Sequence, residues 1–319
     1  DEILSMPANN QISIRALIFY DWGYLNPPSS GWSEYEGVTY SFTTHGGVLE
    51  NLWVFTGPIT KIPQEAFSNS PQSGTITLPP SVKSIEYRAF YGTKTTIILS
   101  DSLESIGMQA FQNSTIYSIN INSPIKELGL GSFVGCSKLN EVSISKDAPL
   151  EIIPELCFYY CSSMNHINIP DNVRTIKRMA FSYCSKLEGI TLPKQLALIE
   201  DNAFDNCGSL TTIVCNSLTP PNLGSNNFTF AKYNGKLIVP SESLEAYKKA
   251  EGWKDFFYIS DGQQYKLIYQ VDGEEYKSYE IECGASITSE AAPTREGYTF
   301  SGWSEIPETM PAKDVTVTG

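Results

Sequence analysis

Apolar residues recur at fixed intervals through most of the chain. Phenylalanine is the clearest marker, and the gaps between successive markers are 21 to 25 residues. The markers are Phe67, Phe90, Phe111, Phe133, Phe158, Phe181 and Phe204. A branched aliphatic residue or leucine stands five positions before each of them, from Ile62 to Ile199, and a second stands three positions earlier. Units that share several registered apolar positions predict a repeat architecture.

Each later unit also contains an apolar pair with period two, such as Ile190/Leu192, and proline closes several pairs, as at Pro193. This alternation predicts a short strand with one buried face, and proline ends the pairing because it has no N–H to donate. The segment around each phenylalanine, such as DNAFDNC, is expected to be a short helical turn or 3₁₀ piece. One coil cannot bury its own apolar residues, so the pattern predicts a solenoid of stacked coils.

The chain ends depart from the repeat and predict caps, because a solenoid otherwise exposes its terminal core. Residues 1–50 are strand-rich and predict a β-rich N-terminal cap, after which Trp53 and Phe55 are assigned to the strand of the first coil. Residues 241–253, SESLEAYKKAEGW, predict a helix with Ser241 as its N-cap. Its apolar face (Leu244, Tyr247 and Ala250) is expected to seal the last coil.

Beyond residue 261 the pattern changes to two alternating strands around Asp272-Gly273, which predicts a β-hairpin. We therefore divide the chain into a cap (1–50), a solenoid with its terminal cap (51–260) and a small C-terminal module (261–319). The predicted fold class is mainly β: a solenoid of short strands and short helical turns between a β-rich N-terminal cap and a helical C-terminal cap segment, followed by the small module.

The repeat resembles the BspA-like leucine-rich repeat, and LEGITLPKQLALIEDNAFDNC at 187–207 follows that pattern almost position for position. The terminal module resembles the Listeria–Bacteroides repeat, which is β-grasp-like. The residues that carry this second resemblance are Pro293, Thr294, Gly297, Tyr298, Phe300, Gly302, Trp303, Met310 and Pro311. These resemblances imply a curved stack of β-coils in a secreted or surface-attached bacterial adhesin.

The composition argues against some classes of binding partner. The formal net charge of −13 argues against nucleic acid and anionic lipid, which need a basic surface. No apolar run approaches the ~20 residues of a membrane-spanning helix. The chain starts at Asp1, which fits a mature or truncated form whose targeting segment has been removed.

Four cysteines follow the repeat, three residues after a phenylalanine: Cys136, Cys161, Cys184 and Cys207. Thiolates that bind one metal must converge, whereas stacked rungs spread them along an axis. Disulfides remain an alternative, because neighbouring rungs approach the required Cα separation, although parallel side chains suit the bridge poorly.

The corresponding position in earlier units holds Ser70, Thr93 and Ser114. A position that accepts Ser, Thr or Cys favours a buried ladder of reduced thiols. Cys157 and Cys215 are assigned to the core, and Cys283 is expected to be a solvent-accessible free thiol.

We expect no catalytic residues, no metal site and no cofactor, since a flat repeat surface offers no fixed pocket for a catalytic triad and neither His45 nor His166 has a recognisable catalytic setting. The candidate ligand-binding residues lie on the outward side of the strands: Thr75, Thr77, Thr96, Ser118, Asn120, Glu141, Ser143, His166, Asn168, Thr191 and Thr212. The alternative is that threonine and serine simply suit an exposed strand. Possible aromatic contacts are Trp22, Tyr24, Trp32 and Tyr35, for which packing within the cap is the competing role.

We therefore expect a non-enzymatic, monomeric binding protein, extracellular or at the cell surface, with any lipid or cell-wall anchor outside this chain. By resemblance its partner would be an extracellular host protein, mucin or glycan. A spacer that projects another surface domain is the alternative, and an accessory protein of a carbohydrate-active enzyme is a third hypothesis.

Overall fold

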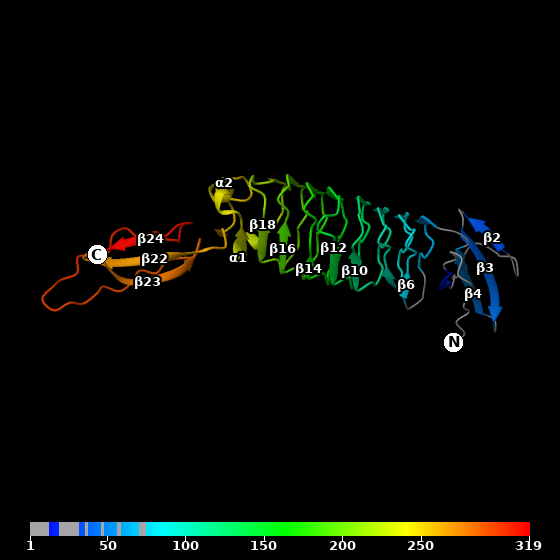
Figure 1. Cartoon of the computed structure of the whole chain (residues 1–319), viewed down its shortest axis with the longest axis horizontal. Coiled ribbons are helices and arrows are strands. Elements are labelled where there is room, and N and C mark those ends of the chain that lie inside the picture. Colours follow the sequence, from blue (N-terminus) through cyan, green and yellow to red (C-terminus); the bar gives the residue numbers. More distant parts are fainter. Residues whose placement is uncertain (1–12, 19–31, 36–37, 46–47, 56–58, 70–74) are drawn as a thin grey trace.

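The computed structural model describes residues 13–18, 32–35, 38–45, 48–55, 59–69 and 75–319, with side chains from residue 59 onward. Figure 1 shows an elongated stack of coils between an N-terminal sheet, drawn in blue, and a C-terminal sheet, drawn in orange and red.

The first side of the solenoid is a ladder of parallel strands, in three hydrogen-bonded groups. Within the described residues these strands are β6 (Thr75–Thr77), β8 (Thr96–Ile98), β10 (Ser118–Ile121), β12 (Glu141–Ile144), β14 (His166–Ile167), β16 (Gly189–Leu192), β18 (Thr212–Cys215), β20 (Lys236–Ile238) and β21 (Tyr258–Ser260). A bridge between Asn168 and Thr191 links β14 to β16.

The second side is a ladder of two-residue strands in two groups of four. They are β5 (Lys61–Ile62), β7 (Ser84–Ile85), β9 (Ser105–Ile106), β11 (Glu127–Leu128), β13 (Ile152–Ile153), β15 (Thr175–Ile176), β17 (Leu198–Ile199) and β19 (Asn222–Leu223). The second residue of each strand from β5 to β17 is buried, so this ladder closes the core from the other side.

The third side holds the phenylalanine segments, and here the predicted helical turns are wrong. Each segment is a non-helical turn in which the residues two before and two after the phenylalanine are left-handed, as at Met179 (φ 55°) and Tyr183 (φ 62°). This geometry frees alternate N–H groups for the next rung: Phe181 donates to the carbonyl of Ala203 at 2.8 Å, while Ala180 closes a turn onto Lys177. The turns therefore form a third ladder that a helix could not make.

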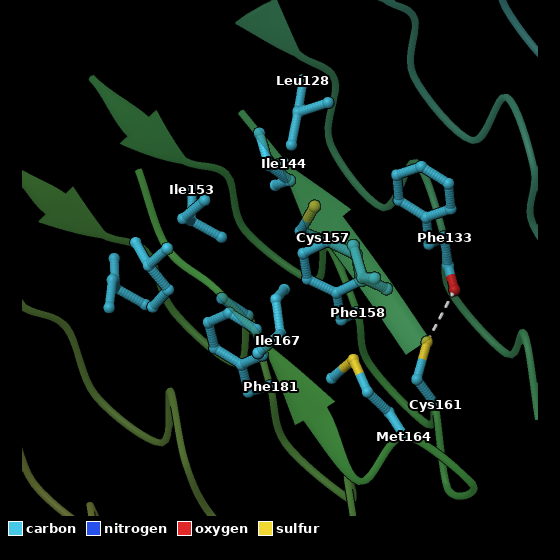
Figure 2. Packing of buried hydrophobic residues seen from close by; sticks show 14 of the residues in the cluster. Leu128, Phe133, Ile144, Ile153, Cys157, Phe158, Cys161, Met164, Ile167 and Phe181 are labelled. Carbon is cyan, nitrogen blue, oxygen red and sulfur yellow. Dashed lines mark hydrogen bonds between the residues drawn. The ribbon is translucent and has the colours of Figure 1, made fainter. Parts of the chain in front are cut away.

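The core is a column of stacked phenylalanine rings. From Phe67 to Phe228, neighbouring ring centroids lie 4.8 to 5.3 Å apart with interplanar angles of 4 to 21°. Aliphatic residues of both strand ladders pack around the rings, as Figure 2 shows for Phe133, Phe158 and Phe181. The core positions predicted from the repeat are thus confirmed.

The N-terminal sheet is antiparallel, in the order β1 (Ser13–Ile18), β4 (Val48–Phe55), β3 (Val38–His45), β2 (Trp32–Tyr35). The assignment of Trp53 and Phe55 to the first coil is wrong, since both lie in β4 opposite Tyr40 and Val38. Strands β3 and β4 pair over their full length. Trp53 and Phe55 therefore belong to this antiparallel hairpin, which precedes the first parallel strand of the solenoid.

The far end is closed by α1 (Ala231–Asn234), the 3₁₀ turn η1 (Ser241–Ser243) and α2 (Leu244–Tyr247). Leu244 and Tyr247 are buried against the last coil, as expected. The helical segment is shorter than predicted, and Ser241 is not its N-cap, because its hydroxyl donates to Asp261 Oδ2 at 2.9 Å.

The C-terminal module has a three-stranded sheet in the order β23 (Glu274–Glu282), β22 (Gln264–Val271), β24 (Val315–Thr318). The predicted hairpin is confirmed, with Asp272 and Gly273 at positive φ between antiparallel β22 and β23. Strand β24 is parallel to β22, and the chain between β23 and β24 contains no helix.

Candidate binding surfaces

The first strand ladder presents a polar outer surface, which we call the strand face. It consists of the exposed or half-buried residues of β6, β8, β10, β12, β14, β16, β18, β20 and β21. Its origin is the pleat: in β10, Ile119 and Ile121 are buried while Ser118 and Asn120 point to solvent. The same alternation repeats from rung to rung.

Registered pairing aligns these side chains in two columns. In the first column Ser118 pairs with Glu141 and Glu141 with His166, and in the second Asn120 pairs with Ser143. The predicted residues therefore share one continuous face. Eight are exposed (Thr75, Thr77, Thr96, Ser118, Asn120, Glu141, His166 and Thr191), and Ser143, Asn168 and Thr212 are half-buried.

Asn168 differs from the other candidates because the main chain already uses its side chain. Its Oδ1 accepts the N–H of Ile144 at 3.0 Å, and its Nδ2 donates to the Ile144 carbonyl. Strand β14 has only two residues, and this amide replaces the missing strand pairing. We therefore remove Asn168 from the set available to a ligand.

Sequence reasoning overlooked apolar members of the same face. Ile98 is 50% exposed in the second column, opposite Thr77. Val214 and Ile238 continue that column beside Thr191 and are half-buried. Outward and inward positions alternate over residues 96–98, which places Ile98 outward. This alternation would have been enough to find Ile98 from the sequence. The second column is thus polar in the middle of the solenoid and contains apolar residues nearer its ends.

A shallow groove of about 610 Å³ runs alongside the strand face, formed by side chains one and three positions before the strands from β10 to β18. Its lining includes Tyr117, Lys138, Asn140, Asn165, Lys186 and Glu188. Sequence reasoning missed it, although the polar residues recur at the repeat spacing around the buried Leu139, Met164 and Leu187.

The predicted aromatic contacts cannot be assessed as a group. Trp22 and Tyr24 lie outside the described residues, and Trp32 and Tyr35 lie at the two ends of β2, where only the backbone is described. A different aromatic group is exposed on the turn side: Tyr160 and Tyr183 stack at 4.5 Å and are 47% and 37% exposed.

The repeated cysteines lie in the core and carry out a structural task. Each thiol donates to the carbonyl of the phenylalanine in the preceding rung, at 3.0 to 3.2 Å. Figure 2 shows this bond between Cys161 and Phe133. Burial raises the pKa of Cys207 to about 12 and holds the pKa of Cys184 well above its usual range, so the neutral donor form is favoured.

The other three cysteines are also buried. Cys157 and Cys215 are core residues, as predicted, and Cys215 accepts a hydrogen bond from the Tyr247 hydroxyl at 3.1 Å. The prediction for Cys283 is wrong, because it is only 1% exposed. It packs into the solenoid core where β23 ends, a contact between modules that no local pattern reveals.

Across the described ranges, no helix combines the length and apolar character that a bilayer crossing requires. Over the same ranges, no three acidic, histidine or cysteine side chains are arranged to hold a metal ion.

Comparison with solved structures finds bacterial leucine-rich repeat proteins. A leucine-rich repeat protein from Bacteroides ovatus is 17% identical (75% of this chain and 76% of that chain covered, TM-score 0.47). One from Eubacterium ventriosum is 23% identical (59% and 49%, TM-score 0.44). A leucine-rich cell surface protein from Faecalibacterium prausnitzii is 18% identical (69% and 72%, TM-score 0.39). A search of curated proteins finds no match.

Family models match two parts of the chain. The model of the BspA type leucine-rich repeat region matches residues 60–150 and 151–250 in 6 copies, which is more than half of the chain. The model of the Listeria–Bacteroides repeat domain matches residues 265–317. With its registered coils and its terminal sheet module, this chain belongs to the BspA-type leucine-rich repeat family and carries a C-terminal Listeria–Bacteroides repeat domain.

Proposed function

We propose that this chain is a non-enzymatic binding protein, secreted or held at a bacterial cell surface, whose strand face binds an extracellular protein or glycan. The observation that carries the proposal is the strand face itself: small polar side chains from consecutive rungs are exposed and in register. The BspA-type family points to a binding or adhesion role, and the ligand proposed here goes beyond that.

The geometry favours binding over catalysis. Within the strand face, His166 is exposed, and its registered neighbour Glu141 lies on an open sheet. Acid–base catalysis needs groups held around a substrate in a fixed, water-excluding site. A sheet surface instead provides a long row of hydrogen-bonding groups, which suits an extended ligand.

The test is binding of the whole chain to an array of extracellular-matrix proteins, mucins and glycans. We expect at least one ligand, and we expect the triple variant Ser118→Ala, Glu141→Ala, His166→Ala to lose most of the binding. The matched control is Glu127→Ala, Glu151→Ala, Arg174→Ala, around the second ladder, because it also removes one net negative charge. Absence of any ligand on the array would favour the spacer hypothesis, and equal binding by both variants would place the binding site outside the strand face.

A further inference from the structure

The groove beside the strand face is a second candidate site with its own chemistry. Buried Leu139, Met164 and Leu187 anchor its floor, so the residues on either side of each point outward along two parallel columns. Lys138 and Lys186 lie in one column, and Asn140, Asn165 and Glu188 in the other. The groove therefore crosses several rungs instead of belonging to one loop.

Two lysines give the groove a local positive charge on an acidic protein. Neither Lys138 nor Lys186 forms an ion pair with any residue that the structure describes, whereas many other lysines do, such as Lys126 with Glu104. The two lysines are two rungs apart, about 9–10 Å at the usual strand spacing. Glu188 is the one acidic residue of the lining, so the groove carries net positive charge in a chain of −13.

The remaining lining residues supply neutral hydrogen bonds and an aromatic surface. Asn140 lies in the same rung as Lys138 and Asn165 in the rung between the two lysines, and each amide offers donors and an acceptor. Tyr117 stands at the end of the same column and is 69% exposed. A solvent-facing tyrosine ring can pack against the apolar face of a sugar while its hydroxyl stays hydrated.

The backbone along the groove is already paired, which decides between ligand classes. The N–H of Asn140 donates to the Tyr117 carbonyl at 2.8 Å, and the N–H of Asn165 donates to the Asn140 carbonyl at 3.1 Å. An extended peptide that adds a strand needs free main-chain groups at a sheet edge, and this groove lies inside the ladder. Recognition here must come from side chains.

We propose that this groove binds an acidic oligosaccharide. Its carboxylate or sulfate groups pair with Lys138 and Lys186, its hydroxyls bond to Asn140 and Asn165, and one sugar ring packs on Tyr117. The site lies outside the strand face and rests on the proposed function only in that the chain acts as a binding protein.

Calorimetric titration of the whole chain tests the proposal with four probes: a hyaluronan octasaccharide for carboxylates, a heparin octasaccharide for sulfates, a neutral cellulose oligosaccharide, and a polyglutamate peptide. We expect at least one acidic sugar to bind, more weakly as salt increases, and the neutral sugar and the peptide to bind more weakly. The two acidic sugars show which anion is preferred.

Substitutions distinguish binding in the groove from attraction by the overall charge of the protein. We expect Lys138→Gln or Lys186→Gln to weaken binding roughly 3- to 10-fold, Glu188→Gln to strengthen it, and Tyr117→Ala to weaken it. The matched controls are the single variants Lys249→Gln and Lys313→Gln, each of which removes one positive charge from an exposed site elsewhere. All these side chains are at the surface, so thermal unfolding should be unchanged.

Three outcomes would overturn the proposal: no acidic sugar binds, the peptide binds as well as the acidic sugars, or a control variant matches the loss in the lysine variants. Failure here leaves the strand face untouched, because the array ligand and the Ser118/Glu141/His166 variant test that surface separately. If both ligands bind and each responds only to its own variant set, both proposals stand.

Discussion

At the scale of single residues, one position explains the cysteines. At Cys136, Cys161, Cys184 and Cys207, three residues after a phenylalanine, the side chain lies beside the phenylalanine carbonyl of the preceding rung, and Ser70 lies outside the described residues. Thr93 and Ser114 fill the same position in earlier rungs and are also buried. The position therefore selects a small side chain that can donate a hydrogen bond, and a thiol meets this requirement without metal or disulfide chemistry.

We expect Cys184→Ser to be tolerated better than Cys184→Ala. Serine keeps a donor for the Phe158 carbonyl, which the Cys184 thiol meets at 3.2 Å, whereas alanine removes it at a cost of about 1 kcal/mol. Urea unfolding of the two variants measures the difference. If serine is the more damaging substitution, the position is purely apolar and the hydrogen bond is unimportant.

The buried thiols also predict a loss of stability at alkaline pH. Burial raises the pKa of Cys157 and of Cys207 to about 12, from an ordinary value of 9.0. The unfolded chain therefore loses these protons first. The free energy of unfolding should fall as pH rises from about 9 toward 12, by about 1.4 kcal/mol per pH unit for each thiol.

The measurement is urea unfolding at several pH values between about 8 and 11. The double variant Cys157→Ser, Cys207→Ser keeps every other titrating group and should show a shallower decline. Identical slopes in the two proteins would show that these thiols do not remain protonated in the folded state.

At the scale of elements, the turns are the part that the sequence could not predict. The strands and the core could be predicted from the spacing of apolar residues. Each rung must bury the same positions, so this spacing is kept even where the polar residues differ. The left-handed positions carry residues as different as Arg88, Gln109, Leu156 and Met179, which usually avoid positive φ. Hydrogen bonds between rungs impose this geometry, and only the units around Phe133 and Phe204 signal it with glycine or asparagine at both left-handed positions.

Close contact between rungs makes Gly129 sensitive to any side chain. A Cβ at this position would lie 2.3 Å from the Met108 nitrogen and 2.4 Å from the Gly107 carbonyl carbon, both backbone atoms. We expect Gly129→Ala to destabilise the protein by about 1–3 kcal/mol, because the rungs must move apart.

Gly208→Ala is the matched control, since a Cβ there meets no atom within 4 Å. Thermal or urea unfolding of both variants makes the comparison. Equal stability of the two variants would mean that the rungs are more loosely stacked than the structure shows.

The candidate surfaces also have a part that the sequence could predict and a part that it could not. Alternation within each strand was enough to place Thr75, Ser118 and Glu141 on one face. The groove was missed because it depends on side chains before the strands, whose direction is set by the turn. The amide of Asn168 was missed because only the pairing of neighbouring rungs shows that β14 is short.

At the scale of the whole molecule, polar contacts around the buried Asp261 fasten the C-terminal module to the solenoid. Asp261 accepts hydrogen bonds from the Ser241 hydroxyl at 2.9 Å and from the Tyr265 hydroxyl at 2.6 Å. An ion pair joins Lys236 of β20 to Glu282 of β23. Burial opposes ionisation of Asp261, but the hydrogen bonds from Tyr265, Gln263 and Ser241 outweigh it and lower its pKa.

We expect Asp261→Ala to loosen this junction without unfolding the solenoid. Small-angle X-ray scattering should then show a broader distribution of distances than in the unaltered protein. Glu251→Ala, which removes a surface carboxylate paired with Lys254, is the control and should leave the distribution unchanged. An unchanged distribution in Asp261→Ala would show that the buried Cys283 contact and the Lys236–Glu282 ion pair are enough to fix the module.

We propose that the solenoid binds its ligand with side chains of the strand face or of the groove beside it. Hydroxyl-radical footprinting of the whole chain, with and without a ligand found on the array, tests this most directly. We expect protection of the strand face, such as Ile98 and His166, or of Tyr117 in the groove, with Tyr160 and Tyr183 unaffected. Protection confined to the turn side, or to the module at residues 265–317, would contradict it.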